Sequence, residues 1–162
     1  MKREEFKELF DKHFDALRNY IYYRCGQAEQ ATDIAQEVFM KLWEKQLHKP
    51  QNEQLALLYK MARDAIISEY RHRQVELAFM ARPFTNGDES SADEALFYKE
   101  LKTMYEKALK AMPDTQREVF LMSRMDALKY HEIAARLDIS VKAVEKRMQK
   151  ALHYLRLALT VQ

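Results

Sequence analysis

Glycine and proline are scarce in this sequence, which has two glycines and three prolines among 162 residues. β-Sandwiches and barrels need many tight turns, and doubly wound α/β folds need glycine in their ligand-binding loops. A shortage of both turn-forming residues argues for a chain built of helices. The sequence therefore predicts an all-α fold.

Several functional classes are excluded or disfavoured by what else is missing. The single cysteine, Cys25, excludes an internal disulfide, a cysteine-rich zinc site and an iron–sulfur cluster. The five histidines lack metal-ligand spacing, and no Gly-rich phosphate loop or nucleophile motif is present, so an enzyme is the least favoured class. No apolar run of about 18 residues occurs, and the charged N-terminus is unlike a secretory signal. We expect a cytoplasmic protein with no membrane insertion, metal or cofactor.

Charge is distributed unevenly, although the net charge is only +2. Residues 1–75 carry +1, residues 76–95 carry −4 and residues 96–162 carry +5. Pro83 and Gly87 lie in the acidic stretch. This pattern predicts two helical modules joined by a flexible acidic linker, with the basic module as the candidate for binding nucleic acid. A chance division of charge is the alternative.

Helices are predicted where apolar residues recur at three- and four-residue steps. The first three cover residues 4–24, 32–46 and 54–73, and Gly26 is placed to end the first. Capping-box patterns at Ser91–Glu94 and Thr115–Glu118 predict two further helix starts. The last two helices are expected over residues 130–137 and 141–158.

Residues 131–147 have the pattern of a helix-turn-helix. Ser140 is placed to cap the second helix, whose expected apolar stripe is Val141, Val144, Met148, Leu152 and Leu155. At about 100° per residue, the opposite face carries Lys142, Lys146, Lys150 and His153, with Arg147 beside them. Such a cationic helix fits the DNA major groove and its phosphates. The alternative is a solvated face on an ordinary helical hairpin.

Two sets of motifs resemble a known family. The segments Ala108–Leu121, Tyr130–Ala134 and Ile139–Glu145 are similar to region four of bacterial RNA polymerase sigma factors, in particular the small extracytoplasmic-function class. The segments Thr32–Trp43, Leu57–Asp64 and Tyr70–Arg73 resemble region two. Both sets lie in the family's order and together cover nearly the whole chain.

The resemblance implies a non-enzymatic protein of two helical domains, the second a four-helix domain. Residues 1–75 would bind the polymerase clamp and minus-ten DNA, residues 76–95 would be the linker, and residues 96–162 would bind the minus-thirty-five element and the polymerase flap. The implied partners are core RNA polymerase, promoter DNA and an anti-sigma factor, and the chain would be a monomer.

Each implied contact falls on particular residues. The expected polymerase contacts are Asp33, Gln36, Glu37 and Met40, which share one helical face. The expected minus-ten contacts are Tyr59, Arg63, Asp64, Arg71 and Arg73, through base stacking and phosphate binding. The expected minus-thirty-five contacts are Ser140, Lys142, Ala143, Lys146, Arg147 and Lys150.

Some positions depart from the family's pattern. Asp64 stands where relatives often carry Asn, Glu145 where they often carry a basic residue, and Asp138 where many have Gly. Asp tolerates the left-handed conformation better than most residues, so the turn should survive. Two alternatives stay open: a helix-turn-helix regulator, and a helical polymerase-binding protein without promoter recognition. The charge pattern also suggests the hypothesis that the two modules pack together in the free protein and hide DNA-binding faces.

Overall fold

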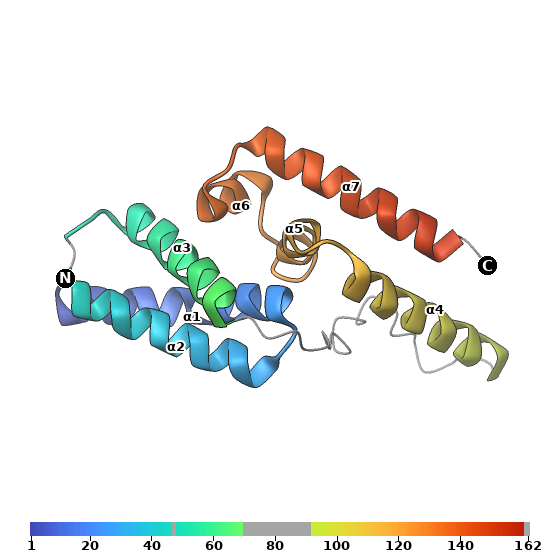
Figure 1. Ribbon diagram of the computed structural model, residues 1–162, viewed down its shortest axis with the longest axis horizontal. Coiled ribbons are helices and arrows are strands. Elements are labelled where there is room, and N and C mark those ends of the chain that lie inside the picture. Colours follow the sequence, from blue (N-terminus) through green and yellow to red (C-terminus); the bar gives the residue numbers. More distant parts are fainter. Residues whose placement is uncertain (47, 70–91, 161–162) are drawn as a thin grey trace.

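The computed structural model describes residues 1–46, 48–69 and 92–160. Over these residues it contains seven α-helices and no strand, so the predicted all-α fold is confirmed. Helices α1 to α3 form one bundle, and α4 to α7 form a second (Figure 1). Residues 92–95 of the expected linker belong to α4, and the flexibility expected of residues 76–91 concerns a stretch outside the described residues.

The first bundle consists of α1 (Arg3–Cys25), α2 (Ala28–Lys45) and α3 (Gln51–Glu69). α1 ends as predicted, since Gly26 has φ 71° and its N–H donates to the carbonyl of Tyr22 at 2.7 Å. Glycine reaches this left-handed conformation without steric cost. α3 begins earlier than expected, directly after Pro50, because a proline is tolerated at a helix start, where its missing N–H has no partner to lose.

Aromatic rings fill the space between α1 and α2. Phe39 of α2 packs edge-on against Phe10 of α1 at 5.1 Å between ring centroids, and Phe10 stacks on Phe14 at 4.7 Å. Trp43 lies at the rim of this cluster, 5.0 Å from the ring of Phe6. The half-buried Trp43 is therefore a residue of the core edge, as the sequence suggested.

The second bundle consists of α4 (Ala92–Ala111), α5 (Asp114–Arg124), α6 (Tyr130–Leu137) and α7 (Val141–Thr160). α7 lies against each of the other three helices. Val119 and Leu121 of α5 and Val144 and Ala151 of α7 have no exposed surface, so the contact between these two helices is the centre of the core.

Two local expectations for this bundle are wrong. α5 begins at Asp114, with Pro113 as its cap residue and no side-chain capping bond, so Thr115 lies inside the helix rather than at its start. Val141 and Leu152 were expected in the core, but they are 40% and 45% exposed, while Ala151 is buried. The buried face of α7 is therefore rotated slightly from the face that the spacing of its apolar residues predicts. The orientation of this face depends on how the neighbouring helices pack against α7.

The two bundles are in direct contact. α5 lies against α1, and α6 lies against α3 (Figure 1). A single cluster of buried apolar side chains includes residues of both bundles. The hypothesis that the halves pack together therefore matches the structure, although the contacts involve buried residues of α1 and α5 rather than the charge of the linker.

We expect the substitution Ala127→Gly to stabilise the protein. Ala127 follows α5 with φ 53°, a left-handed conformation that costs a non-glycine residue about 1 kcal/mol. Glycine removes that cost but gains freedom in the unfolded chain, so the free energy of unfolding should rise by about 0.5 kcal/mol in urea denaturation. The matched control Ala135→Gly, on the exposed face of α6, should lower it by about 1 kcal/mol. Destabilisation by both would contradict strain at Ala127.

Candidate nucleic-acid interface

The helix-turn-helix predicted from the sequence is formed by α6, a short turn and α7. Asp138 ends α6 in the left-handed conformation, with φ 55° and ψ 48°, which confirms that this turn tolerates an aspartate. The Oγ of Ser140 accepts a hydrogen bond from the N–H of Ala143 at 3.0 Å, which confirms the predicted cap of α7. The turn and the cap together set the direction in which α7 leaves α6.

The cationic stripe predicted on α7 is present on its outer face. Lys142, Lys146 and Lys150 are exposed, and Ala143 is half-buried beside them. Glu145 is also exposed on this helix, so the stripe contains one carboxylate. Arg147 differs from the lysines, because its guanidinium turns toward the protein and lies 3.6 Å from Glu118. The lysines are free to meet a phosphate backbone, whereas Arg147 already has an anionic partner.

The residues expected to bind the polymerase share one exposed face of α2. Asp33, Gln36, Glu37 and Met40 are all exposed, and the side chain of Met40 is 62% exposed. Glu37 forms an ion pair with the neighbouring Lys41, at 3.5 Å. An acidic face with an exposed methionine is a suitable surface for a basic protein partner.

The residues expected to bind minus-ten DNA are placed in very different environments. Asp64 of α3 is exposed and Arg63 is half-buried, while Arg71 and Arg73 lie outside the described residues. Tyr59 has no exposed surface. The ring of Tyr20 packs edge-on against it at 5.1 Å, and burial raises the pKa of its hydroxyl. In this arrangement the Tyr59 ring is closed to an unpaired base.

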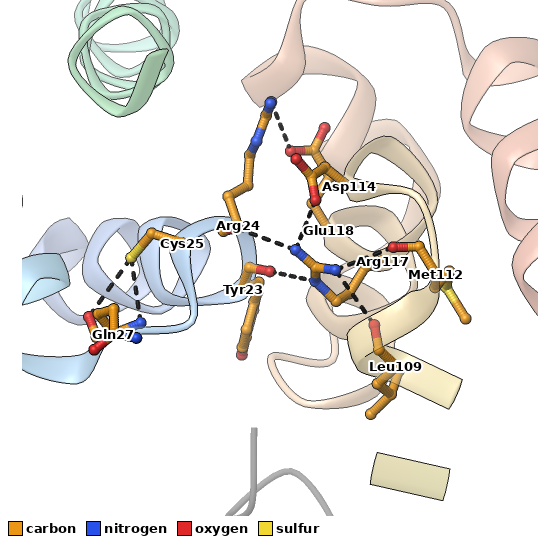
Figure 2. A network of polar contacts seen from close by, with 9 residues as sticks. All are labelled: Tyr23, Arg24, Cys25, Gln27, Leu109, Met112, Asp114, Arg117 and Glu118. Atoms are coloured by element: carbon orange, nitrogen blue, oxygen red, sulfur yellow. Dashed lines mark hydrogen bonds and ion pairs between the residues drawn. The ribbon is translucent and has the colours of Figure 1, made fainter. Parts of the chain in front are cut away.

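A buried arginine, which the sequence analysis did not single out, joins the two bundles (Figure 2). Arg117 of α5 is 1% exposed. Across the boundary, its Nε donates to the carbonyl of Tyr23 at 2.7 Å and its Nη2 donates to the carbonyl of Arg24 at 3.0 Å. Its remaining bonds stay within the second bundle, to the carbonyls of Leu109 and Met112 and to the Asp114 carboxylate. Burial lowers the pKa of Arg117, and Asp114 opposes that shift.

Its neighbour Glu118 is an equally buried carboxylate. It accepts a hydrogen bond from Arg24 of α1 at 3.2 Å, and Arg147 of α7 lies 3.6 Å from its second oxygen. Burial raises the pKa of Glu118, while Arg24 and Arg147 favour the ionised form. Removing a buried carboxylate's partner is costly because the charge is then left uncompensated, so the two arginines and Glu118 act as a unit.

A second polar contact between the bundles lies in the turn after α5. Asp126 accepts hydrogen bonds from the Tyr23 hydroxyl at 2.8 Å and from Asn19 Nδ2 at 3.2 Å. Burial raises the pKa of Asp126, and these two donors oppose the shift. α1 is thus connected to both ends of α5.

The sequence held only a weak signal for this network. Arg117 and Glu118 directly precede the apolar run Val119–Met122, and the capping-box pattern Thr115–Glu118 gives Glu118 a local role and Arg117 none. Their partners on α1 are more than 90 residues away, and four of the five acceptors of Arg117 are backbone carbonyls. A backbone carbonyl is present in every residue, so no pattern of side chains could identify these partners.

Within residues 1–46, 48–69 and 92–160, no group of three or more His, Cys, Asp or Glu side chains could hold a metal ion. None of the helices in these ranges has the length and apolar character needed to cross a membrane.

Comparison with known families matches both bundles. The model for sigma-70 region 2 matches residues 9–75, and the model for sigma-70 region 4 matches residues 102–155. The first matched segment begins within α1 and includes α2 and α3, and the second runs from the middle of α4 to residue 155 of α7.

Curated relatives match the chain over most of its length. The ferric citrate uptake sigma factor FecI of Escherichia coli is 26% identical over 92% of this chain and 87% of its own. The RNA polymerase sigma factor SigZ of Bacillus subtilis is 28% identical over 89% and 81%. The ECF RNA polymerase sigma factor SigK of Mycobacterium tuberculosis is 29% identical over 96% and 86%.

A solved structure shares the fold. It is the sigma factor RpoE of Bartonella quintana, in complex with the anti-sigma factor NepR. The TM-score is 0.58 and the identity is 20%, over 98% of this chain and 99% of that one.

We predict that Arg117→Met strongly destabilises the protein. The change leaves buried carbonyls and Asp114 without their donor, which should lower the free energy of unfolding by about 3 kcal/mol or more. Arg117→Lys should also destabilise, because an ammonium cannot reach acceptors on both sides as a planar guanidinium does. The control Arg124→Met, on the exposed side of the same helix, should change stability by less than about 0.5 kcal/mol. Equal effects at both positions in denaturant titrations would contradict the role of Arg117.

Proposed function

The chain belongs to the sigma-70 family of RNA polymerase sigma factors, in the extracytoplasmic-function class, and from that membership we propose a binding role for each of its two halves. As a sigma factor it binds RNA polymerase and directs promoter-specific initiation of transcription. Synthesis of RNA is the work of the polymerase itself.

We assign polymerase docking and minus-ten recognition to residues 1–75. The exposed face of α2, with Asp33, Glu37 and Met40, is suited to the clamp of core polymerase. Tyr59, Arg63, Asp64, Arg71 and Arg73 are assigned to the minus-ten element. The exposed carboxylate of Asp64 repels phosphate but can accept a hydrogen bond from cytosine, so it would influence the preferred minus-ten sequence.

We assign recognition of the minus-thirty-five element to residues 96–162, with residues 76–95 as the linker. The observation that carries this assignment is the exposed lysine stripe on the second helix of a capped helix-turn-helix. The residues assigned are Ser140, Lys142, Ala143, Lys146, Arg147 and Lys150. A contact with the polymerase flap is part of the same proposal.

The remaining partners and the location are also proposals. An anti-sigma factor is the proposed regulator, which is supported by the solved relative, a sigma factor in complex with an anti-sigma factor. The proposed location is the cytoplasm, where polymerase and promoters are found, and the proposed free state is a monomer.

Reconstitution with core polymerase from the source bacterium tests the proposed function. Transcripts initiated on fragmented genomic DNA should share start sites preceded by two spaced elements. The variant Asp33→Lys/Glu37→Lys, which reverses the charge of the proposed docking face, should bind core at least tenfold more weakly. The control Asp11→Lys/Asp15→Lys, on exposed positions of α1, should bind normally. Binding to core without promoter-directed initiation would contradict the proposal.

We predict that the lysine stripe of α7 determines the salt dependence of DNA binding. Lys142→Ala/Lys146→Ala should weaken binding to duplex promoter DNA and reduce the slope of log affinity against log salt by about two, one for each lost phosphate contact. The control Lys102→Ala/Lys107→Ala removes two exposed lysines of α4 and should leave the slope unchanged. Equal slopes for both double variants would place the DNA on another surface.

A further inference from the structure

We propose that Glu145 of α7 selects a cytosine in the minus-thirty-five element. Its carboxylate accepts a hydrogen bond from the N4 amino group of that base in the major groove. The inference rests on the proposed minus-thirty-five role of α7, and it adds a base preference at one position of the element. Glu145 is then a specificity-determining residue beside the lysines that hold the phosphates.

α7 presents two rows of side chains to solvent. The helices α4, α5 and α6 all lie on one side of α7, and Val144 on that side has no exposed surface (Figure 1). One outward row is the lysine stripe. Beside it, Val141, Glu145 and Gln149 follow one another at four-residue steps, and all three are exposed. Because the buried face of α7 is rotated from the predicted one, this second row points to solvent rather than into the core.

The two rows offer different chemistry to DNA. The lysines are cations that neutralise phosphates in any sequence. The second row contains no cation. Val141 is 40% exposed and offers methyl groups that suit the methyl group of thymine. Glu145 offers only acceptors, and the amide of Gln149 offers both donors and acceptors. Groups of these kinds distinguish one base pair from another, so the second row is suited to contact base edges.

No cation of the described structure neutralises Glu145. A carboxylate on a DNA-binding face repels phosphates, and a cation one turn away can compensate for this, as Lys41 does for Glu37 on α2. The positions four residues before and after Glu145 hold Val141 and Gln149, which carry no charge. Glu145 forms no ion pair with any residue that the structure describes. Its oxygens are therefore available to a donor on the DNA.

Cytosine is the base that suits a carboxylate in the major groove. Guanine presents the acceptors N7 and O6 there, and thymine presents the acceptor O4, so both repel a carboxylate. Adenine presents the N6 amino group, but its N7 acceptor lies beside that group. Cytosine presents an amino donor and no acceptor of its own. One side chain can therefore discriminate against all three other bases.

Glu145 also lies in the part of a recognition helix that reaches base edges. In a helix-turn-helix, the N-terminal residues of the second helix make these contacts. α7 begins at Val141, and the bond from the Ala143 N–H to Ser140 fixes its first turn. Glu145 follows Val141 by about one turn, or about 6 Å along the helix axis. Both side chains can therefore reach base pairs within one short DNA element.

A promoter library with a randomised minus-thirty-five element tests this inference. Core polymerase reconstituted with the wild-type chain should favour cytosine at one position, on one strand, at least fivefold over each other base. Glu145→Ala should abolish that preference and leave the preferences at the other positions unchanged. Glu145→Gln should shift it to adenine, because an amide can accept from N6 and donate to N7. The control Glu100→Ala removes an exposed carboxylate of α4 and should keep the cytosine preference.

A base analogue separates the hydrogen bond from general repulsion. The base 2-pyrimidinone is a cytosine without its N4 amino group. In place of the selected cytosine, it should weaken promoter binding by the wild-type holoenzyme at least fivefold and binding by the Glu145→Ala holoenzyme less than twofold. Equal losses for the two holoenzymes would overturn the proposed hydrogen bond.

The outcomes distinguish this inference from the proposed function. If Glu145→Ala raises transcription from all promoters equally and leaves every base preference unchanged, Glu145 only repels phosphate and the inference is wrong. Promoter-directed transcription without a cytosine preference that depends on Glu145 would also overturn it, and the proposed function would stand. Absence of promoter-directed transcription by the wild-type chain would overturn the proposed function, and this inference with it.

Discussion

The buried guanidinium of Arg117 is the interaction on which the arrangement of the whole molecule depends. Arginine has five N–H donors in a fixed plane, and in a water-free site they need acceptors. Here those acceptors come from the end of α1, the end of α4 and the start of α5. The hydrogen bonds of this one side chain therefore hold three helix ends together. In this arrangement α5 lies against α1 and α6 lies against α3.

This arrangement combines two opposing requirements. The charged groups at the boundary, which lie beside a shared apolar cluster, are stable there only while each keeps its partner, yet they are well solvated once the halves separate. A boundary made of apolar side chains alone would expose a larger aggregation-prone surface on opening. Glu118 is buried and Asp126 is half-buried, and each keeps its partner across the boundary only while the two halves stay in contact.

Local features of the site could be predicted from the sequence because each depends on residues close together in the chain. The cap from Ser140 to Ala143 spans three residues, and the left-handed turn at Asp138 involves a single backbone position. The lysine stripe of α7 and the acidic face of α2 follow from helical geometry alone. Thr115 shows the limit of such reasoning, since Pro113 starts the helix first and removes the expected cap.

The sequence by itself determined the all-α class, the two sets of motifs and the polar face of each helix. The tertiary structure alone decided which of those side chains are available. The motif predicts that Tyr59 stacks on an unpaired base, but its ring lies beneath Arg136, which is 77 residues away in the sequence. Periodicity gives the face of a helix, whereas the partner of that face depends on how distant helices meet. The two acceptors that Arg117 has on α1 are backbone carbonyls, which no side-chain pattern encodes.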